Sequence, residues 1–396
     1  MNLPLWCQQC GGPLDDDDRC PRCGAPALLG FLQREFLVLA VLSVVAVTAF
    51  LATRGVAQLY ADIRERDAAA WYRTGQAHLA NGHPEEAAEA FRHATAMARE
   101  NQAYRLALAA ALTAHGRDEA ARQVLLGVRA LAPEHPEANL RLARLEARRD
   151  DESAAVRYYQ NALYGVWEPD RAEQRASVRV ELIEYLLARG RQDRALAELL
   201  ALEGNLPAEP AAYLQAGHLF RRAGDPARAL AQFERVLARH PKHADAAAGA
   251  AEAAFSLGDY ARAQRHLRTA PADRQDVVEL RQVTSMVLAR DPLAPRLSYA
   301  ERRRRLIENL TQTADDVGAC SDSPEVRSRV DPLHEEAQGL LAALARRTAT
   351  QSLETIETGV DLVYRLRREL ADRCGASGAA HRALLIIGER HQIDPS

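Results

Sequence analysis

Residues 210–241 read PAAYLQAGHLFRRAGDPARALAQFERVLARHP, and this stretch decides the fold of the chain. Small and apolar residues recur there every three or four positions, on both sides of Gly224 and Pro226. That spacing puts them on one face of each of two helices, with the glycine and proline marking the turn between them. The stretch therefore predicts a helical hairpin.

The same pattern returns along the chain with a period of about 34 residues. Copies begin at residues 68, 102 and 136 and, after an insertion around Asp170–Arg175, at residues 176, 210 and 244. Small residues such as Gly75 and Gly217 are expected to let helices approach closely, while Phe91 and Phe233 fill the space between neighbours. A single hairpin cannot bury its apolar faces, so the copies are expected to stack.

This pattern resembles the tetratricopeptide family, which has Trp and Gly in the first helix of a repeat and Ala, Phe and Ala in the second. In the first copy these are Trp71, Gly75, Ala87, Phe91 and Ala94. The resemblance covers residues 68–290, including a capping helix near Gln275–Ala289. It implies an all-α fold, a superhelix of about six helix pairs whose concave groove binds peptides or partner helices.

The resemblance also implies which first-helix residues face that groove. They are Tyr72, Arg144, Arg148, Glu184, His218, Arg221 and Arg222. Arg148, Arg221 and Arg222 are candidates to hold a carboxylate through paired hydrogen bonds. The lysines and asparagines of the family's clamp for chaperone tails are not reproduced here. A solvated helix face remains the alternative role for each arginine.

Four cysteines near the N-terminus form two C-x-x-C pairs, each followed by glycine: Cys7, Cys10, Cys20 and Cys23. A two-residue gap lets both thiolates of a pair face one ion, and four thiolates complete a tetrahedral zinc site. Gly11 and Gly24 permit the left-handed turn that directs backbone N–H groups at sulfur. Residues 1–27 resemble the short zinc ribbons of bacterial membrane proteins, and we expect structural zinc (Zn) there. A thioredoxin-like motif is the alternative, but no βαβ pattern surrounds either pair.

Residues 36–53, FLVLAVLSVVAVTAFLAT, contain no charged side chain. As a helix they span about 27 Å, close to the thickness of a bilayer's hydrocarbon core. We expect an uncleaved, single-pass transmembrane helix with its flank in residues 28–55, and a linker or helix at residues 56–67. A buried core helix and a cleaved signal peptide are the alternatives.

The orientation in the membrane is predicted from the cysteines. Arginines flank both ends of the apolar run, so flanking charge does not decide it. Thiolate zinc sites persist where thiols stay reduced, so we expect a cytoplasmic ribbon and an extracytoplasmic repeat arm.

Residues 291–396 are expected to form a helical bundle that resembles no named family. Its helices are predicted at 298–317, Pro332–Arg347, Leu353–Arg373 and Ala380–His391, the first opened by a capping box of Ser298 and Glu301. Cys320 and Cys374 would reach the same end of an up-down-up bundle, so a disulfide is plausible, with two free cysteines as the alternative. Arg302–Arg305 are expected to be solvated and paired with local acids.

The sequence offers no catalytic constellation. The one lysine, Lys242, lies in a polar turn without the glycines of a phosphate-binding loop, and His334-Glu-Glu-Ala-Gln338 lacks the second histidine of a zinc-protease motif. No nucleophile elbow or dinucleotide fingerprint is present. We expect a non-enzymatic protein with no evident small-molecule substrate.

The function expected from these features is that of a membrane-anchored adaptor or scaffold, which binds protein or peptide partners in its repeat groove. One alternative is a ribbon that contacts nucleic acid below an envelope sensor arm. Nucleic acid is not the expected partner, because Arg19 and Arg22 face the four aspartates of residues 15–18. The other alternative is an accessory factor for assembly of an envelope complex.

Overall fold

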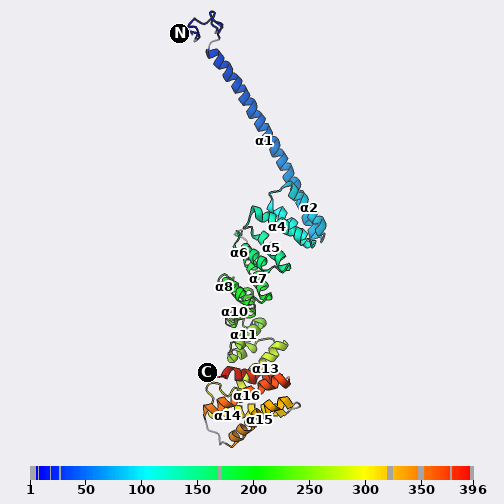
Figure 1. Ribbon diagram of the computed structural model, residues 1–396, viewed down its shortest axis with the longest axis vertical. Coiled ribbons are helices and arrows are strands. Elements are labelled where there is room, and N and C mark those ends of the chain that lie inside the picture. The colour runs from blue at the N-terminus through cyan, green and yellow to red at the C-terminus, as the bar shows by residue number, and fades with distance from the viewer. Residues whose placement is uncertain are drawn as a thin grey trace. The chain divides into compact units, whose positions relative to one another are not determined.

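The computed structural model describes residues 6–7, 9–17, 19–25, 28–167, 172–318, 324–346, 352–374 and 377–392. Within these residues the chain forms seventeen helices and no strand, which confirms the expected all-α class (Figure 1). Two compact units divide the chain, Met1–Trp167 and Glu168–Ser396. The division falls at the insertion that interrupts the repeat period.

The first unit contains three helical hairpins. Its helices are α1 (Leu28–Ala80), α2 (Pro84–Met97), α3 (Gln102–Ala114), α4 (Asp118–Leu131), α5 (Pro136–Arg148) and α6 (Glu152–Tyr164). The predicted repeat starts at residues 102 and 136 coincide with the first residues of α3 and α5. The first repeat differs, because its first helix is the C-terminal part of α1.

Helix α1 is continuous over 53 residues and extends away from α2–α6 as a single helix (Figure 1). Its most apolar 18-residue window has a mean hydropathy of 2.6 and is 0% buried. Packing begins at Ala68, which is fully buried in a cluster with Ala94 and Tyr104. Residues 56–67 are therefore helical, and they join the apolar run to the first repeat without a break.

The second unit contains three further hairpins and the C-terminal bundle. The hairpin helices are α7 (Ala172–Ala188), α8 (Gln192–Glu203), α9 (Pro210–Arg222), α10 (Pro226–Arg239), α11 (Ala244–Ser256) and α12 (Tyr260–Leu267). The repeat starts predicted at 210 and 244 are confirmed, whereas the fourth repeat begins at Ala172, earlier than the predicted residue 176. With the first unit, the described residues hold the six helix pairs that the period predicted.

Glycine and phenylalanine pack together as the repeat pattern predicted. Phe233 on α10 is fully buried, and a Cβ added at either Gly217 or Gly249 would lie 2.7 Å from its Cε1 atom. A Cβ added at Gly75 would lie 2.6 Å from Cε1 of Phe91. Only glycine allows the helices to approach the rings this closely.

The bundle consists of α13 (Gln275–Arg290), α14 (Tyr299–Gly318), α15 (Pro324–Ala345), α16 (Leu353–Cys374) and α17 (Ala379–His391). Its core joins Leu306, Leu310 and Leu366 with Val283 and Val287 of α13. The expected capping helix thus packs into the bundle, and one apolar core crosses the division expected at residue 290.

Two predicted helix starts in the bundle had different outcomes. The start at Pro332 is wrong, because α15 begins at Pro324 and contains Pro332. Val330, two residues before Pro332 on the same helix, is buried in the bundle core. The start of α14 is confirmed: the Glu301 N–H donates to Oγ of Ser298 at 3.3 Å.

Candidate functional site

The two cysteine pairs fold into knuckles of the same backbone geometry. The Gly11 N–H donates to the carbonyl of Cys7 at 2.8 Å, and the Gly24 N–H donates to the carbonyl of Cys20 at 2.8 Å. Both glycines have positive φ, 68° and 72°, as their position after the C-x-x-C pairs predicted. Each knuckle buries its first cysteine and exposes its second.

The four sulfur atoms lie within 4.8 Å of one another. The distance from Cys7 Sγ to Cys23 Sγ is 3.5 Å, and that from Cys10 Sγ to Cys20 Sγ is 3.3 Å. Tetrahedral zinc, with bonds of about 2.3 Å to sulfur, requires sulfur atoms about 3.8 Å apart. The four cysteines can therefore hold a metal ion, and soft thiolate donors suit zinc.

The electrostatics of this site favour a bound cation. Backbone N–H groups of Gln9 and Cys10 lower the pKa of Cys7. Burial raises the pKa of Cys20. Hydrogen bonds from the Cys10 thiol and from backbone N–H groups outweigh burial and lower the pKa to about 6. A backbone hydrogen bond from Ala25 lowers the pKa of Cys23, yet the neighbouring thiols raise it to about 12. All four sulfurs ionise together only if a cation balances them.

Between the knuckles, Asp15 and Arg19 close a turn. The Asp15 N–H donates to the carbonyl of Arg19 at 2.8 Å, and the Arg19 N–H donates to Oδ1 of Asp15 at 2.7 Å. The Asp15 carboxylate is used locally, which accounts for an aspartate at this position.

The structure assigns packing and pairing roles to the groove candidates of the first unit. The Tyr72 ring is half-buried, with its centroid 4.8 Å from that of Tyr104 and 5.5 Å from that of Phe91. Arg148 donates to both carboxylate oxygens of Asp118, each at 3.0 Å. The paired hydrogen bonds expected for a partner's carboxylate are thus made within the chain. Arg144 is exposed on α5.

In the second unit, α9 carries three of the groove candidates. The His218 ring packs edge-on against Phe233, with centroids 5.0 Å apart. Burial, and then the charge of Arg221, lowers the pKa of His218. Arg221 donates to Oε2 of Glu252 at 2.7 Å. Arg222 on α9 and Glu184 on α7 are exposed.

Ion pairs between neighbouring repeats connect them, a feature that the sequence reasoning missed. In the first unit, Arg122 donates to Glu146 at 2.7 Å and Arg149 donates to Glu119 at 2.6 Å. Glu146 has a side-chain exposure of only 4%, so its pairing with Arg122 is shielded from solvent. In the second unit, Glu234 pairs with both Arg262 and His266. Opposite charges 24 to 32 residues apart, somewhat less than one repeat period, were the available signal.

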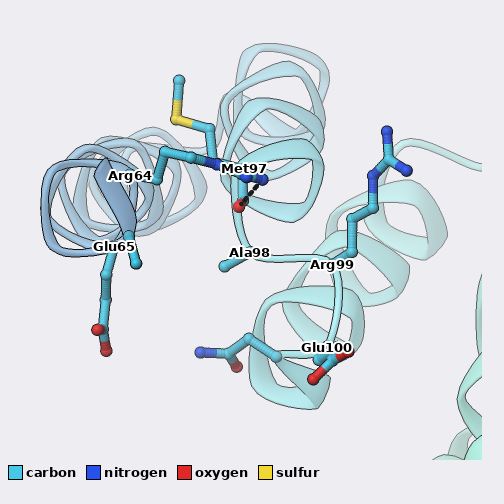
Figure 2. Close-up of a pocket in the computed structure, with 8 residues that line it drawn as sticks. Arg64, Glu65, Met97, Ala98, Arg99 and Glu100 are labelled. Carbon is cyan, nitrogen blue, oxygen red and sulfur yellow. Dashed lines mark hydrogen bonds between the residues drawn. The ribbon is translucent and has the colours of Figure 1, made fainter. Parts of the chain in front are cut away.

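A pocket of about 520 Å³ lies where α1 meets the connection from α2 to α3 (Figure 2). Arg64 donates from Nη2 to the carbonyl of Met97 at 2.8 Å and so ties α1 to the end of α2. Glu65, Arg99 and Glu100 give the lining both signs of charge. The pocket is a polar junction of helices, and its lining holds no nucleophile paired with a base.

The predicted Cys320–Cys374 disulfide lies outside the described residues, because Cys320 and the side chain of Cys374 are not among them. It stays a prediction.

Comparisons with known proteins identify the repeats. One tetratricopeptide-repeat family model matches residues 78–145 and 220–286, and a second matches residues 46–99. No curated protein matches the chain significantly.

Several solved structures are similar to parts of the chain. YrrB, described as a TPR protein with an unusual peptide-binding site, is 21% identical with a TM-score of 0.39, covering 48% of this chain and 97% of YrrB. The C-terminal part of a TPR protein from Cytophaga hutchinsonii is 12% identical with a TM-score of 0.41, covering 79% and 99%. A chain of Naa15/Naa10 bound to HypK-THB is 15% identical with a TM-score of 0.44, covering 82% and 55%. From the family models, the chain carries tetratricopeptide repeats.

Proposed function

We propose that this protein is a membrane-anchored adaptor or scaffold whose tetratricopeptide repeats bind protein or peptide partners. One observation carries the proposal: no residue of the apolar run on α1 is buried, and the same helix continues into the first repeat. The chain thus joins a segment suited to lipid directly to a protein-binding arm.

The exposure of the apolar run is the argument for a bilayer. Large side chains including Phe36, Leu42, Val44 and Phe50 are each more than half exposed. Soluble proteins rarely leave so large a contiguous apolar surface uncovered. The length of the run, about 27 Å, fits a hydrocarbon core, and its backbone is satisfied within the helix.

The length of α1 also sets the distance between the apolar run and the repeats. Ala68 lies fifteen positions after Thr53 on this helix, which places the first buried residue of the repeats about 22 Å beyond the apolar run. Because α1 has no break between these points, the repeats are held at a defined distance from the membrane.

Partner binding is proposed at the first helices of the repeats. Arg222, Glu184 and Arg144 are exposed there. Arg148 and Arg221 are already oriented by Asp118 and Glu252. Within each unit, a partner would meet polar side chains that these pairs hold in place.

The cysteine site is proposed to hold structural zinc. Its thiolates would stay reduced in the cytoplasm, so the proposal places the ribbon on the cytoplasmic side and the repeats on the opposite side. In this role the metal folds the short N-terminal segment and does no chemistry.

Anchoring is tested by extracting membranes with alkaline carbonate, which releases peripheral proteins. The wild-type chain is expected in the pellet. Val44→Arg combined with Val45→Arg is expected to move it to the supernatant, because each arginine at the centre of a span costs about 2.5–3.5 kcal/mol. The matched control is Ala57→Arg, an exposed position on the same helix beyond the run. Release of the wild-type chain would contradict anchoring.

Partner binding is tested with photo-crosslinking residues placed at Arg222 and Glu184. The matched control is Ala231, an exposed position on the second helix α10. We expect discrete cross-linked protein partners from the first-helix positions and not from position 231. Equal labelling at all three positions would contradict a groove on the first helices.

A further inference from the structure

An apolar stripe on α1 continues beyond the segment proposed to cross the membrane. Val56, Leu59, Tyr60 and Ile63 follow the uncharged run, and each is between 43% and 65% exposed. Ile63 lies about 15 Å beyond Thr53, whereas lipid headgroups add only about 5–8 Å to each side of a hydrocarbon core. Lipid therefore does not cover the end of this stripe.

The first repeat packs on the opposite side of α1. Arg64 donates to the carbonyl of Met97 on that side (Figure 2), and Ala68 is fully buried there in a cluster with Ala94. Each residue turns an α-helix by about 100°, so Ile63 lies about 140° around the helix from Ala68. The apolar stripe thus faces away from the repeat that α1 helps to build.

The stripe has the spacing of a coiled-coil seam. Apolar residues follow one another at alternating steps of four and three along one face of α1: Val45, Ala49, Ala52, Val56, Leu59 and Ile63. In a heptad this places β-branched Val56 and Ile63 at a and Leu59 at d, the combination that favours two parallel strands. A repeat of exactly this period keeps the seam on a partner helix through a left-handed supercoil.

The seam stands out where the helix leaves the uncharged run. There the residues outside it include Gln58, Asp62 and Glu65, all exposed. The apolar residues at a and d are therefore not a by-product of a wholly apolar segment. An exposed apolar stripe between polar faces marks a surface that another helix covers.

The charges beside the seam suit a second copy of α1. Arg66 occupies the next d position, where a parallel partner places its own Asp67, at e, beside it. Asp62, four residues before Arg66, supports the same arginine within its own helix. All three side chains are exposed in the single chain.

The size of the seam is that of a specific interface. From Phe36 to Asp67 the exposed face of α1 is about 48 Å long and about 10 Å wide. Two such faces together cover about 1,000 Å², the size at which specific interfaces begin. One helix from each copy is therefore enough to form the pair.

We propose that α1 pairs in parallel with α1 of a second copy of this chain, along the seam that ends at Ile63. Identical chains anchored in one membrane run in the same direction, so the inference rests on the anchoring proposed above. The first repeat of each copy lies on the outer side of its helix. The adaptor thus presents two repeat arms from one membrane anchor.

Cysteine cross-linking in cell membranes tests the pairing in the full-length chain. Leu59→Cys is compared with Gln58→Cys, an exposed neighbour outside the seam. Membranes are oxidised with copper phenanthroline, and the wild-type chain gives the background from the six native cysteines. We expect a band of twice the chain mass from Leu59→Cys, at least tenfold stronger than that from Gln58→Cys. Val56→Cys and Ile63→Cys should behave like Leu59→Cys.

A charge in the seam should separate the two helices. In the Leu59→Cys chain, Ile63→Asp is expected to reduce the cross-linked fraction at least tenfold, because two carboxylates then face each other at one a layer. The matched control is Gln58→Asp, which adds the same charge outside the seam and should leave the fraction unchanged. Alkaline carbonate extraction reports anchoring separately, and all of these variants should stay in the pellet.

Four outcomes would overturn the proposal. Cross-linking of Leu59→Cys no stronger than that of Gln58→Cys, with the chain in the pellet, would mean that the copies meet at random. A cross-linked band that is not twice the chain mass would identify a different partner. Equal cross-linking after Ile63→Asp and Gln58→Asp would refute the seam. Release of the wild-type chain by carbonate would instead refute the anchoring, and with it the parallel arrangement.

Discussion

Because Phe233 packs against two glycines, Gly249→Ala is expected to change stability in opposite directions with and without the Phe233 ring. In the native protein, a Cβ at position 249 would lie 2.7 Å from Cε1 of Phe233, a ring that also packs closely against Gly217. Overpacking of this kind costs about 1–3 kcal/mol. The replacement of glycine by alanine in a helix stabilises the folded state by about 1 kcal/mol. Gly249→Ala is therefore expected to destabilise the wild-type repeats by about 1 kcal/mol.

The same substitution should stabilise a chain that lacks the ring. Phe233→Ala removes a fully buried side chain and is expected to cost about 3–5 kcal/mol. In that background the added methyl group meets no ring, and only the gain in helix propensity of about 1 kcal/mol remains. The two positions are thus coupled by about 2 kcal/mol, within the range measured for residues in contact.

The assay is hydrogen exchange of the α9–α11 amides in the full-length chain, because repeat proteins open locally and a single melting curve mixes several transitions. The matched control is Gly127→Ala on α4, where an added Cβ meets nothing within 4 Å. It should stabilise its own repeat in any background. If Gly249→Ala changes the stability in the same direction in the wild-type chain and in the Phe233→Ala chain, the packing argument is refuted.

Three further predictions follow from the site and the repeats. Cys20→Ser is expected to lose the bound metal, measured as zinc per chain by elemental analysis, whereas Asp16→Asn, an exposed turn position, should retain it; equal zinc content in both would contradict the four-cysteine site. Burial lowers the pKa of His218, so the native state favours its neutral form. Its contribution to stability is present above the ordinary pKa of about 6.5 and is lost as pH falls below it. The urea midpoint of His218→Gln should therefore depend less on pH between 7 and 5 than that of the wild type; identical pH profiles would count against burial. Arg64→Ala is expected to loosen the junction of α1 with α2 by about 1 kcal/mol, seen as faster exchange at the end of α2; unchanged exchange would show that the hydrogen bond to Met97 is dispensable.

The repeats were predictable because their signal is redundant. Each copy repeats the same spacing of small and bulky residues, and the starts at 102, 136, 210 and 244 coincide with helix starts. Pro226, after Gly224, marks the turn within a hairpin, and Gly11 and Gly24 mark the knuckles. These are local rules, which a sequence states directly.

The parts that escaped prediction depend on tertiary contacts. Pro332 is a helix breaker by local rule, yet α15 passes through it while Val330 is held in the core. Arg302–Arg305 were expected to be solvated. Instead Arg302, Arg303 and Arg305 donate to backbone carbonyls outside α14, and among the four only Arg304 pairs solely with local acids.

The groove candidates show the same limit. Family geometry placed Arg148 and Arg221 on first helices, but their acceptors Asp118 and Glu252 lie about 30 residues away. The spacing of residues within one helix cannot predict ion pairs with residues on another helix. The hydrogen bonds from buried Arg367 on α16 to Thr313 and Asp316 on α14 were missed for the same reason, since they join two helices far apart in the sequence.

The central claim is that one transmembrane helix separates the cysteine site from the repeats. The most direct measurement is a pair of reporter fusions in intact cells, one before Met1 and one after Ser396, using one reporter active only in the cytoplasm and one active only outside it. We expect cytoplasmic activity at the first position and external activity at the second. Activity of both fusions on the same side would contradict the single-pass anchor, and the reverse pattern would refute the cytoplasmic placement of the cysteine site.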